Sequence, residues 1–241
     1  SVISQKWANK TVIFYGILPK HSESPIAHLN TMACVNEIAS MNIPYMLADL
    51  STYEDDVYDV AYDKIRKHIL TSLNIIRGDY LTASKHGMMD ELDELTIISE
   101  PGYMSIVFVD NISQSSVEKQ SIQSSVINAI KNSASASIQR DGIVKQMGVI
   151  TNLPEELDDP IKTGNYSELE EYIGTPLATF ENYSVTDKPN GNIALIISGM
   201  SLPYNSLSES IKIINEYEQK NKDAKSYNND LSEDIGKHAG L

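Results

Sequence analysis

The fold class is decided by residues 11–50, which read TVIFYGILPKHSESPIAHLNTMACVNEIASMNIPYMLADL. Residues 11–18 are apolar and rich in β-forming side chains without alternation, which is typical of a strand buried on both faces. Ser24 is a preferred helix N-cap residue, and Pro25 suits the first helical position because its missing N–H has no helical partner there. Residues 43–50 are again apolar, so the stretch predicts a strand, a helix and a second, parallel strand.

The predicted helix carries a broad apolar face, formed by Ile26, Leu29, Met32, Ala33, Val35 and Ile38. Cys34, the only cysteine, lies among these residues, and we interpret it as a small core residue. A single cysteine excludes an intramolecular disulfide and a zinc site built on cysteines. It also suits a reducing compartment.

The rest of the sequence continues the alternation of strands and helices. Helices are predicted at 51–78, 115–133, 167–173 and 206–220, the first from a capping box at Ser51 to Glu54 and an apolar stripe at helical spacing. Strands are predicted at 95–99, 104–110, 143–151 and 192–200, whereas 175–185 is either a strand or an extended excursion. This order predicts an α/β protein with a mostly parallel sheet and helices on both faces, a Rossmann-like three-layer arrangement.

Residues 1–220 are predicted to form a single α/β domain. The acidic stretch 152–190 is either a small side lobe of this domain or part of its sheet, and the same choice is open for 79–103. Residues 221–241 are polar and are predicted to form a C-terminal tail, which fits self-association better than a place in the core.

The chain of 241 residues is acidic, with a formal net charge of −14 at pH 7. Such a surface repels phosphate backbones and anionic lipids, so neither nucleic acid nor a membrane is an expected partner. No apolar run is long enough to span a membrane, and the first residues lack the pattern of a signal peptide. We therefore expect a cytoplasmic location, or assembly into a particle formed in the cytoplasm.

No nucleotide-binding motif is present in the sequence. Gly16 stands alone after the first strand, so the G-x-G-x-x-G fingerprint is missing, and no P-loop occurs. Asp55, Asp56 and Asp59 match the D-D-x-x-D pattern, but their place at the start of a predicted helix favours a solvated helix terminus over Mg²⁺ binding. The histidines lack the spacing of metal ligands. We expect no cofactor and no metal.

Ligands of open α/β sheets bind beyond the carboxyl ends of the strands. The polar residues predicted at these ends are Lys20, His21, Ser22, Asp49, Asp110, Asn111, Ser198, Ser201 and Asn205. From this set, Lys20, His21, Asp49 and Asp110 are the candidate catalytic residues.

Two functions remain open from the sequence alone. The missing catalytic motif, the acidic surface and the polar tail favour a non-enzymatic structural or assembly subunit that binds other protein subunits, and a virus or phage particle component fits this description. The alternative is a Rossmann-like enzyme that binds a small molecule at the Lys20–His21 loop, Asp49 and Asp110. A deep polar pocket at the strand ends would favour the enzyme.

Overall fold

The structure is a computed structural model, and it describes residues 11–78, 81, 89–138, 143–157 and 159–239. Its centre is a six-stranded sheet with the strand order β1-β2-β3-β6-β4-β5. The strands are β1 (Phe14–Leu18), β2 (Pro44–Asp49), β3 (Gly102–Ile112), β4 (Gln146–Pro154), β5 (Ala178–Thr186) and β6 (Gly191–Met200). Only β6 runs against its neighbours β3 and β4, whereas the other neighbouring pairs are parallel. The predicted mostly parallel α/β sheet is confirmed.

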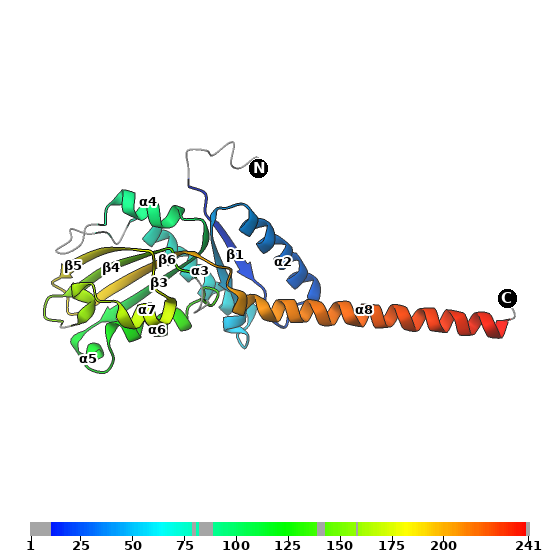
Figure 1. The fold of residues 1–241 in the computed structure, drawn as a ribbon. Coiled ribbons are helices and arrows are strands. Elements are labelled where there is room, and N and C mark those ends of the chain that lie inside the picture. The colour runs from blue at the N-terminus through cyan, green and yellow to red at the C-terminus, as the bar shows by residue number, and fades with distance from the viewer. Residues whose placement is uncertain (1–10, 79–80, 82–88, 139–142, 158, 240–241) are drawn as a thin grey trace.

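Helices cover both faces of this sheet, as predicted (Figure 1). They are α2 (Pro25–Ser40), α3 (Tyr58–Ile76), α4 (Glu91–Ser99), α5 (Gln114–Val117), α6 (Ile122–Lys131), α7 (Ser167–Ile173) and α8 (Tyr204–Ala239), with short 3₁₀ turns at η1 (Leu50–Tyr53) and η2 (Pro160–Thr163). The larger core cluster joins the sheet to α2, α6, α7 and the start of α8. Smaller clusters join the opposite face to α3 and α4.

Two predicted elements differ from those observed. The predicted helix 51–78 begins only at Tyr58, because Ser51 donates both its N–H and its hydroxyl to Asp49 and belongs to the turn η1. The predicted strand 95–99 is the end of helix α4, which begins with a capping box between Asp90 and Asp93. A capping box satisfies two helix-terminal N–H groups, and here it outweighs the β propensity of the apolar residues that follow.

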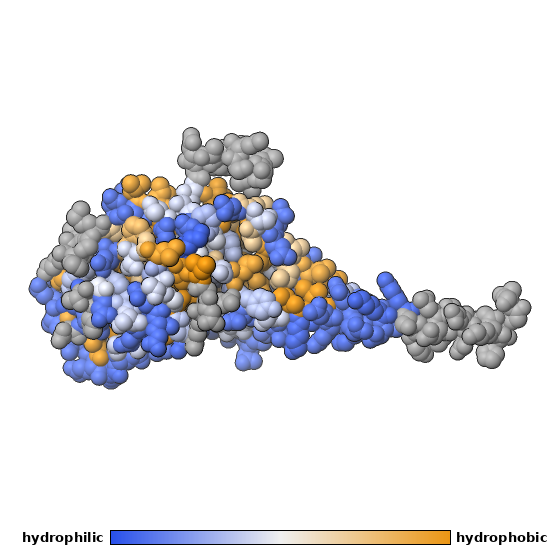
Figure 2. Space-filling model, viewed as in Figure 1, coloured by the Kyte–Doolittle hydropathy of each residue, from blue (hydrophilic) through white to orange (hydrophobic). Residues whose placement is uncertain are grey.

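The first strand, β1, is one of the two edge strands of the sheet. The prediction that it is buried on both faces is wrong. Most of β1 is only half-buried, and 39% of Ile17 is exposed. Cys34 is also exposed, which corrects its interpretation as a core residue. The buried side of α2 carries His28, Val35 and Ile38, and Met32 packs partly buried against the core. Ile26, Leu29 and Ala33 are exposed, and an apolar surface lies over α2 beside α8 (Figure 2).

The polar stretch after residue 220 continues α8 as a helix. From Asn215 to Lys225 every residue of α8 is exposed, so the helix has left the rest of the molecule by this point (Figure 1). Residues 178–186 form the edge strand β5, which places part of the acidic stretch 152–190 in the sheet. Within the described ranges, no helix is long and apolar enough to cross a membrane.

Candidate functional site

A cavity of about 480 Å³ opens at the carboxyl ends of β1 and β2. Its walls come from the loops after these strands, from residues 133–138 and from the first turns of α8. The sequence-predicted residues His21, Asp49 and Asn205 all line it. The fold therefore brings three of the predicted strand-end residues together, although they lie far apart in the sequence.

Asp49 is the most buried carboxylate of this cavity, with 6% of the residue exposed. It is the last residue of β2 and the N-cap of η1, so the end of the strand fixes its position. Its Oδ1 accepts the Ser51 N–H at 2.9 Å and the Ser51 hydroxyl at 2.5 Å. These two bonds fix the orientation of the carboxylate at the cavity wall.

His21 belongs to a loop that Glu54 holds in place. The two carboxylate oxygens of Glu54 accept the N–H groups of His21 at 3.0 Å and Ser22 at 3.1 Å. Partial burial works to raise the pKa of Glu54, but the bonds from Ser22 and His21 outweigh it and lower the pKa below its ordinary value. The carboxylate therefore stays charged and clamps the loop at neutral pH.

Lys20 does not line the cavity, and its side chain instead holds two backbone segments together. Only 3% of Lys20 is exposed, and its ammonium donates to the backbone carbonyls of Glu54 at 3.0 Å and Asp56 at 2.5 Å. These bonds tie the loop after β1 to the segment that connects β2 and α3. Lys20 therefore positions its neighbour His21.

A strip of alternating serine and alanine at 133–137 forms one wall of the strand-end cavity. None of its residues was predicted from the sequence to be a site residue. It pairs with the end of β2, since Asp49 N–H donates to Ala134 at 2.7 Å and Ala136 N–H donates to Leu47 at 2.8 Å. Ser133, Ser135 and Ser137 all line the cavity. The period of two in Ser-Ala-Ser-Ala-Ser is a signal for extended backbone with one polar face, and it could have revealed this wall.

The other predicted strand-end residues lie elsewhere. Asp110 and Asn111 are exposed at the end of β3 and do not line this cavity, and Asp110 Oδ1 accepts the N–H of Asn111 at 2.8 Å. Ser198 is fully buried near the end of β6, and its hydroxyl has no hydrogen-bond partner within the described residues. Because β6 is antiparallel to its neighbours, its last residue, Met200, lies opposite Tyr103 at the start of β3. The carboxyl end of β6 therefore lies at the same end of the sheet as the amino ends of the parallel strands.

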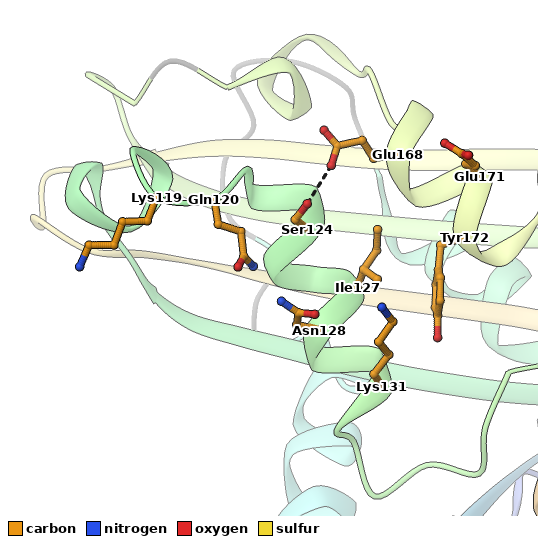
Figure 3. Close-up of a pocket in the computed structure, with 9 residues that line it drawn as sticks. All are labelled: Lys119, Gln120, Ser124, Ile127, Asn128, Lys131, Glu168, Glu171 and Tyr172. Atoms are coloured by element: carbon orange, nitrogen blue, oxygen red, sulfur yellow. Dashed lines mark hydrogen bonds between the residues drawn. The ribbon is translucent and has the colours of Figure 1, made fainter.

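A larger hollow, of about 620 Å³, lies between α6 and α7 on the surface (Figure 3). The described strands do not end at this hollow. Some of its polar groups already have partners: Ser124 donates to Glu168 at 3.0 Å, and the Lys131 ammonium lies 5.2 Å from the ring centroid of Tyr172. Lys131 and Tyr172 also line the strand-end cavity, so the two hollows share a wall. We regard the strand-end cavity as the functional site because it contains buried Asp49 and lies where α/β sheets bind ligands.

The strand-end cavity offers hydroxyl, amide, imidazole, ammonium and carboxylate groups. Such a set can hydrogen-bond a sugar, a base or another polyfunctional small molecule. No described group of three or more histidine, cysteine, aspartate or glutamate residues could hold a metal ion.

Neither a family model nor a curated protein matches the chain. Solved structures do. TubZ of Clostridium botulinum phage c-st has a TM-score of 0.66 at 20% identity, covering 91% of this chain and 65% of that one. TubZ of Bacillus thuringiensis serovar israelensis, in its GDP-form protofilaments, has a TM-score of 0.72 at 13% identity, covering 100% and 66%. CetZ from Methanosaeta thermophila has a TM-score of 0.66 at 15% identity, covering 99% and 66%.

The chain has the fold of TubZ and CetZ. It spans slightly less than two thirds of the length of each of these structures. The Bacillus protein was also solved as a GTPγS-form protofilament. A fold shared with proteins solved as nucleotide-form protofilaments overturns the prediction of a non-enzymatic structural or assembly subunit of a virus or phage particle. It also conflicts with the preference for a non-enzyme over an enzyme, a question that the sequence left open.

Proposed function

We propose that this chain is the greater part of a guanine-nucleotide-dependent, filament-forming GTPase of the TubZ and CetZ kind. The observation that carries the proposal is a polar cavity at the strand ends of a fold shared with proteins solved in GDP and GTPγS forms. A cytoplasmic location, where guanine nucleotides are available, is part of the proposal.

In this proposal the cavity holds the base and ribose of the nucleotide. Its hydroxyl and amide groups suit these neutral parts, and the buried carboxylate of Asp49 suits the N–H donors of a guanine. The phosphates need a different environment, and the sequence has no glycine-rich loop to cradle them. The proposal for this cavity therefore covers the base and the ribose and not the phosphates.

Self-association through α8 is the second part of the proposal. The described side chains from Asn215 to Lys225 are exposed around the whole helix. A polar helix without tertiary contacts is only marginally stable in water, so this part of α8 gains stability when it packs against another subunit. The protofilaments formed by TubZ of Bacillus thuringiensis support this role.

Nucleotide titration tests the first part. We expect saturable binding of a fluorescent GTP analogue, competed by unlabelled GTP and by guanosine, since the cavity is assigned to the base and ribose. Asn205→Ala should weaken binding by about fivefold, the cost of one neutral hydrogen bond. Asn221→Ala, a matched change on the exposed part of α8, should leave binding unchanged. Binding that guanosine does not compete would contradict the assignment of the cavity.

Light scattering tests the second part. The full chain should form larger species as its concentration rises, and a chain ending at Asn221 should remain monomeric. If both scatter as monomers at every concentration, α8 is not the assembly element.

A further inference from the structure

The sheet splits between β2 and β3, and a further hollow lies beside this split. β2 pairs with β3 only at Pro44–Gly102 and Tyr45–Tyr103, and the remainder of β2 pairs with the strip at 134–136. A cavity of about 360 Å³ lies beside the split, between α3, the middle of β3 and the end of α6. Its volume falls within the range of small-molecule sites.

The two sides of this cavity differ in character. From α3, a stripe at helical spacing lines it with Lys67, His68, Thr71 and Ser72. The facing wall is mainly apolar. It contains Ile106, Val107 and Phe108 of β3 together with Ala129 and Ala134, and its polar residues are Asn132 and Ser133. A ligand that fits must therefore have one polar end and one apolar body.

The charges at this cavity select the kind of polar end. Burial lowers the pKa of His68 to about 4, so its imidazole is neutral at physiological pH, and its Nε2 lies 3.0 Å from the hydroxyl of Ser135. Lys67 is the one charged residue in the lining, and no acidic residue takes part, although the chain carries a net charge of −14. The cavity therefore favours an anion.

Ser72 adds an independent sign of a ligand. Only 2% of this residue is exposed, and its hydroxyl has no hydrogen-bond partner among the described residues. Buried hydroxyl groups normally have a partner, and one that lines a cavity can find it in a bound molecule. Ser72 and Thr71 lie one turn from His68 and Lys67, so their hydroxyls and the ammonium can reach one ligand end.

We propose that this cavity binds a compact aromatic carboxylate. The carboxylate accepts from the Lys67 ammonium and from the hydroxyls of Thr71 and Ser72, and the ring packs against Ile106 and Phe108. One lysine neutralises a monocarboxylate, whereas a phosphate would bring a further charge without a partner. This cavity shares Ser133 with the strand-end cavity, but the proposal does not rest on the function proposed for that cavity.

Calorimetric titration of the full chain with benzoate, 2-naphthoate and indole-3-acetate tests the proposal. At least one of the three should bind at a single site, and 2-naphthalenemethanol, which lacks the charge, should bind at least tenfold more weakly. Lys67→Gln should weaken binding of the acid by about tenfold or more, as expected for a lost charge-assisted hydrogen bond. Arg66→Gln is the matched control, since Arg66 pairs with Asp63 at 2.8 Å and does not line the cavity.

Filling the cavity gives a second, structural test. Ala129→Phe places a ring in the space, and it should abolish binding of the acid while the far-ultraviolet circular dichroism stays that of the wild type. If this variant does not fold, Ser72→Ala provides the test, with an expected loss of about fivefold. The proposal is wrong if none of the three acids binds, or if Lys67→Gln and Arg66→Gln bind equally well.

Discussion

The Nδ1 atom of His28 lies 2.9 Å from the hydroxyl oxygen of Ser210. Both residues are buried, and they join α2 to the start of α8, the long helix that projects from the molecule. This bond therefore anchors the projecting helix.

Ser210→Ala removes this bond and leaves the imidazole of His28 without its partner in the core. The loss of one buried hydrogen bond should lower the free energy of unfolding by about 1–2 kcal/mol. Amide hydrogen exchange should accelerate in α2 and the first turns of α8, and urea unfolding gives the free energy. Ser208→Ala is the control, because Ser208 is exposed on the same helix. Equal losses in the two variants would show that the anchor lies elsewhere.

Lys20→Met keeps the buried stem of the side chain and removes its ammonium. The carbonyls of Glu54 and Asp56 then lose a charged donor, and the free energy of unfolding should fall by about 3 kcal/mol. Lys64→Met removes an exposed ion pair with Asp56 and should cost no more than about 1 kcal/mol. Thermal unfolding of the two variants gives the comparison, and a Lys20→Met protein as stable as Lys64→Met would contradict the structural role of Lys20.

The loop that carries His21 should loosen in acid. Hydrogen bonds from Ser22 and His21 outweigh burial and lower the pKa of Glu54 below the ordinary 4.5. The stability that the clamp provides is therefore present above pH 4.5 and is lost as the pH falls through the lowered pKa. The protection factors of the His21 and Ser22 amides against hydrogen exchange should fall over this range. In Glu54→Gln the exchange should be fast already at neutral pH and should not change in the same way.

His68 should make the protein less stable at mildly acid pH. Burial lowers its pKa from 6.5 to about 4, so the unfolded chain binds a proton between these values and the folded chain does not. Stability is therefore complete above pH 6.5 and falls as the pH drops towards 4, by about 3 kcal/mol in total for this residue. His68→Gln should flatten the pH dependence of urea unfolding between pH 7 and pH 5. An unchanged slope in this variant would show that His68 titrates normally.

Local patterns were enough to predict several elements from the sequence. The strand, helix and strand at the start were found as predicted, with Ser24 as the N-cap of α2 and Pro25 in its first turn. Helix α7 spans the predicted residues 167–173, and β6 closely matches the predicted strand. These segments combine strong caps or continuous apolar runs, which leave little choice between helix and strand.

The direction of β6 was not predicted, although the sequence contained the information. The turn at 187–190 joins β5 to β6, and a parallel connection needs a dozen or more residues. So short a turn forces β6 to run against β5. Because the antiparallel direction of β6 was not predicted, Ser198 and Ser201 were wrongly grouped with the carboxyl ends of the parallel strands. The carboxyl end of β6 lies at the other end of the sheet.

The strand-end site was predicted in part, for a physical reason. His21 and Asp49 follow parallel strands, so the rule for open sheets places them together. The serines of 133–137 come from a connection whose path depends on pairing with β2, and such long-range pairing is not visible in local sequence. The burial of Lys20 likewise depends on carbonyls more than thirty residues away.

The two edge strands of the sheet, β1 and β5, have different surroundings. At β5, Tyr166 donates to Glu181 at 2.6 Å and Lys162 lies 5.8 Å from the ring centroid of Tyr183, so neighbouring segments pack on one face of that strand. At β1, every second N–H and C=O points away from β2, and the strand contains no lysine, proline or bulge that would block pairing. An added strand, in cis or in trans, would therefore find a backbone template at β1.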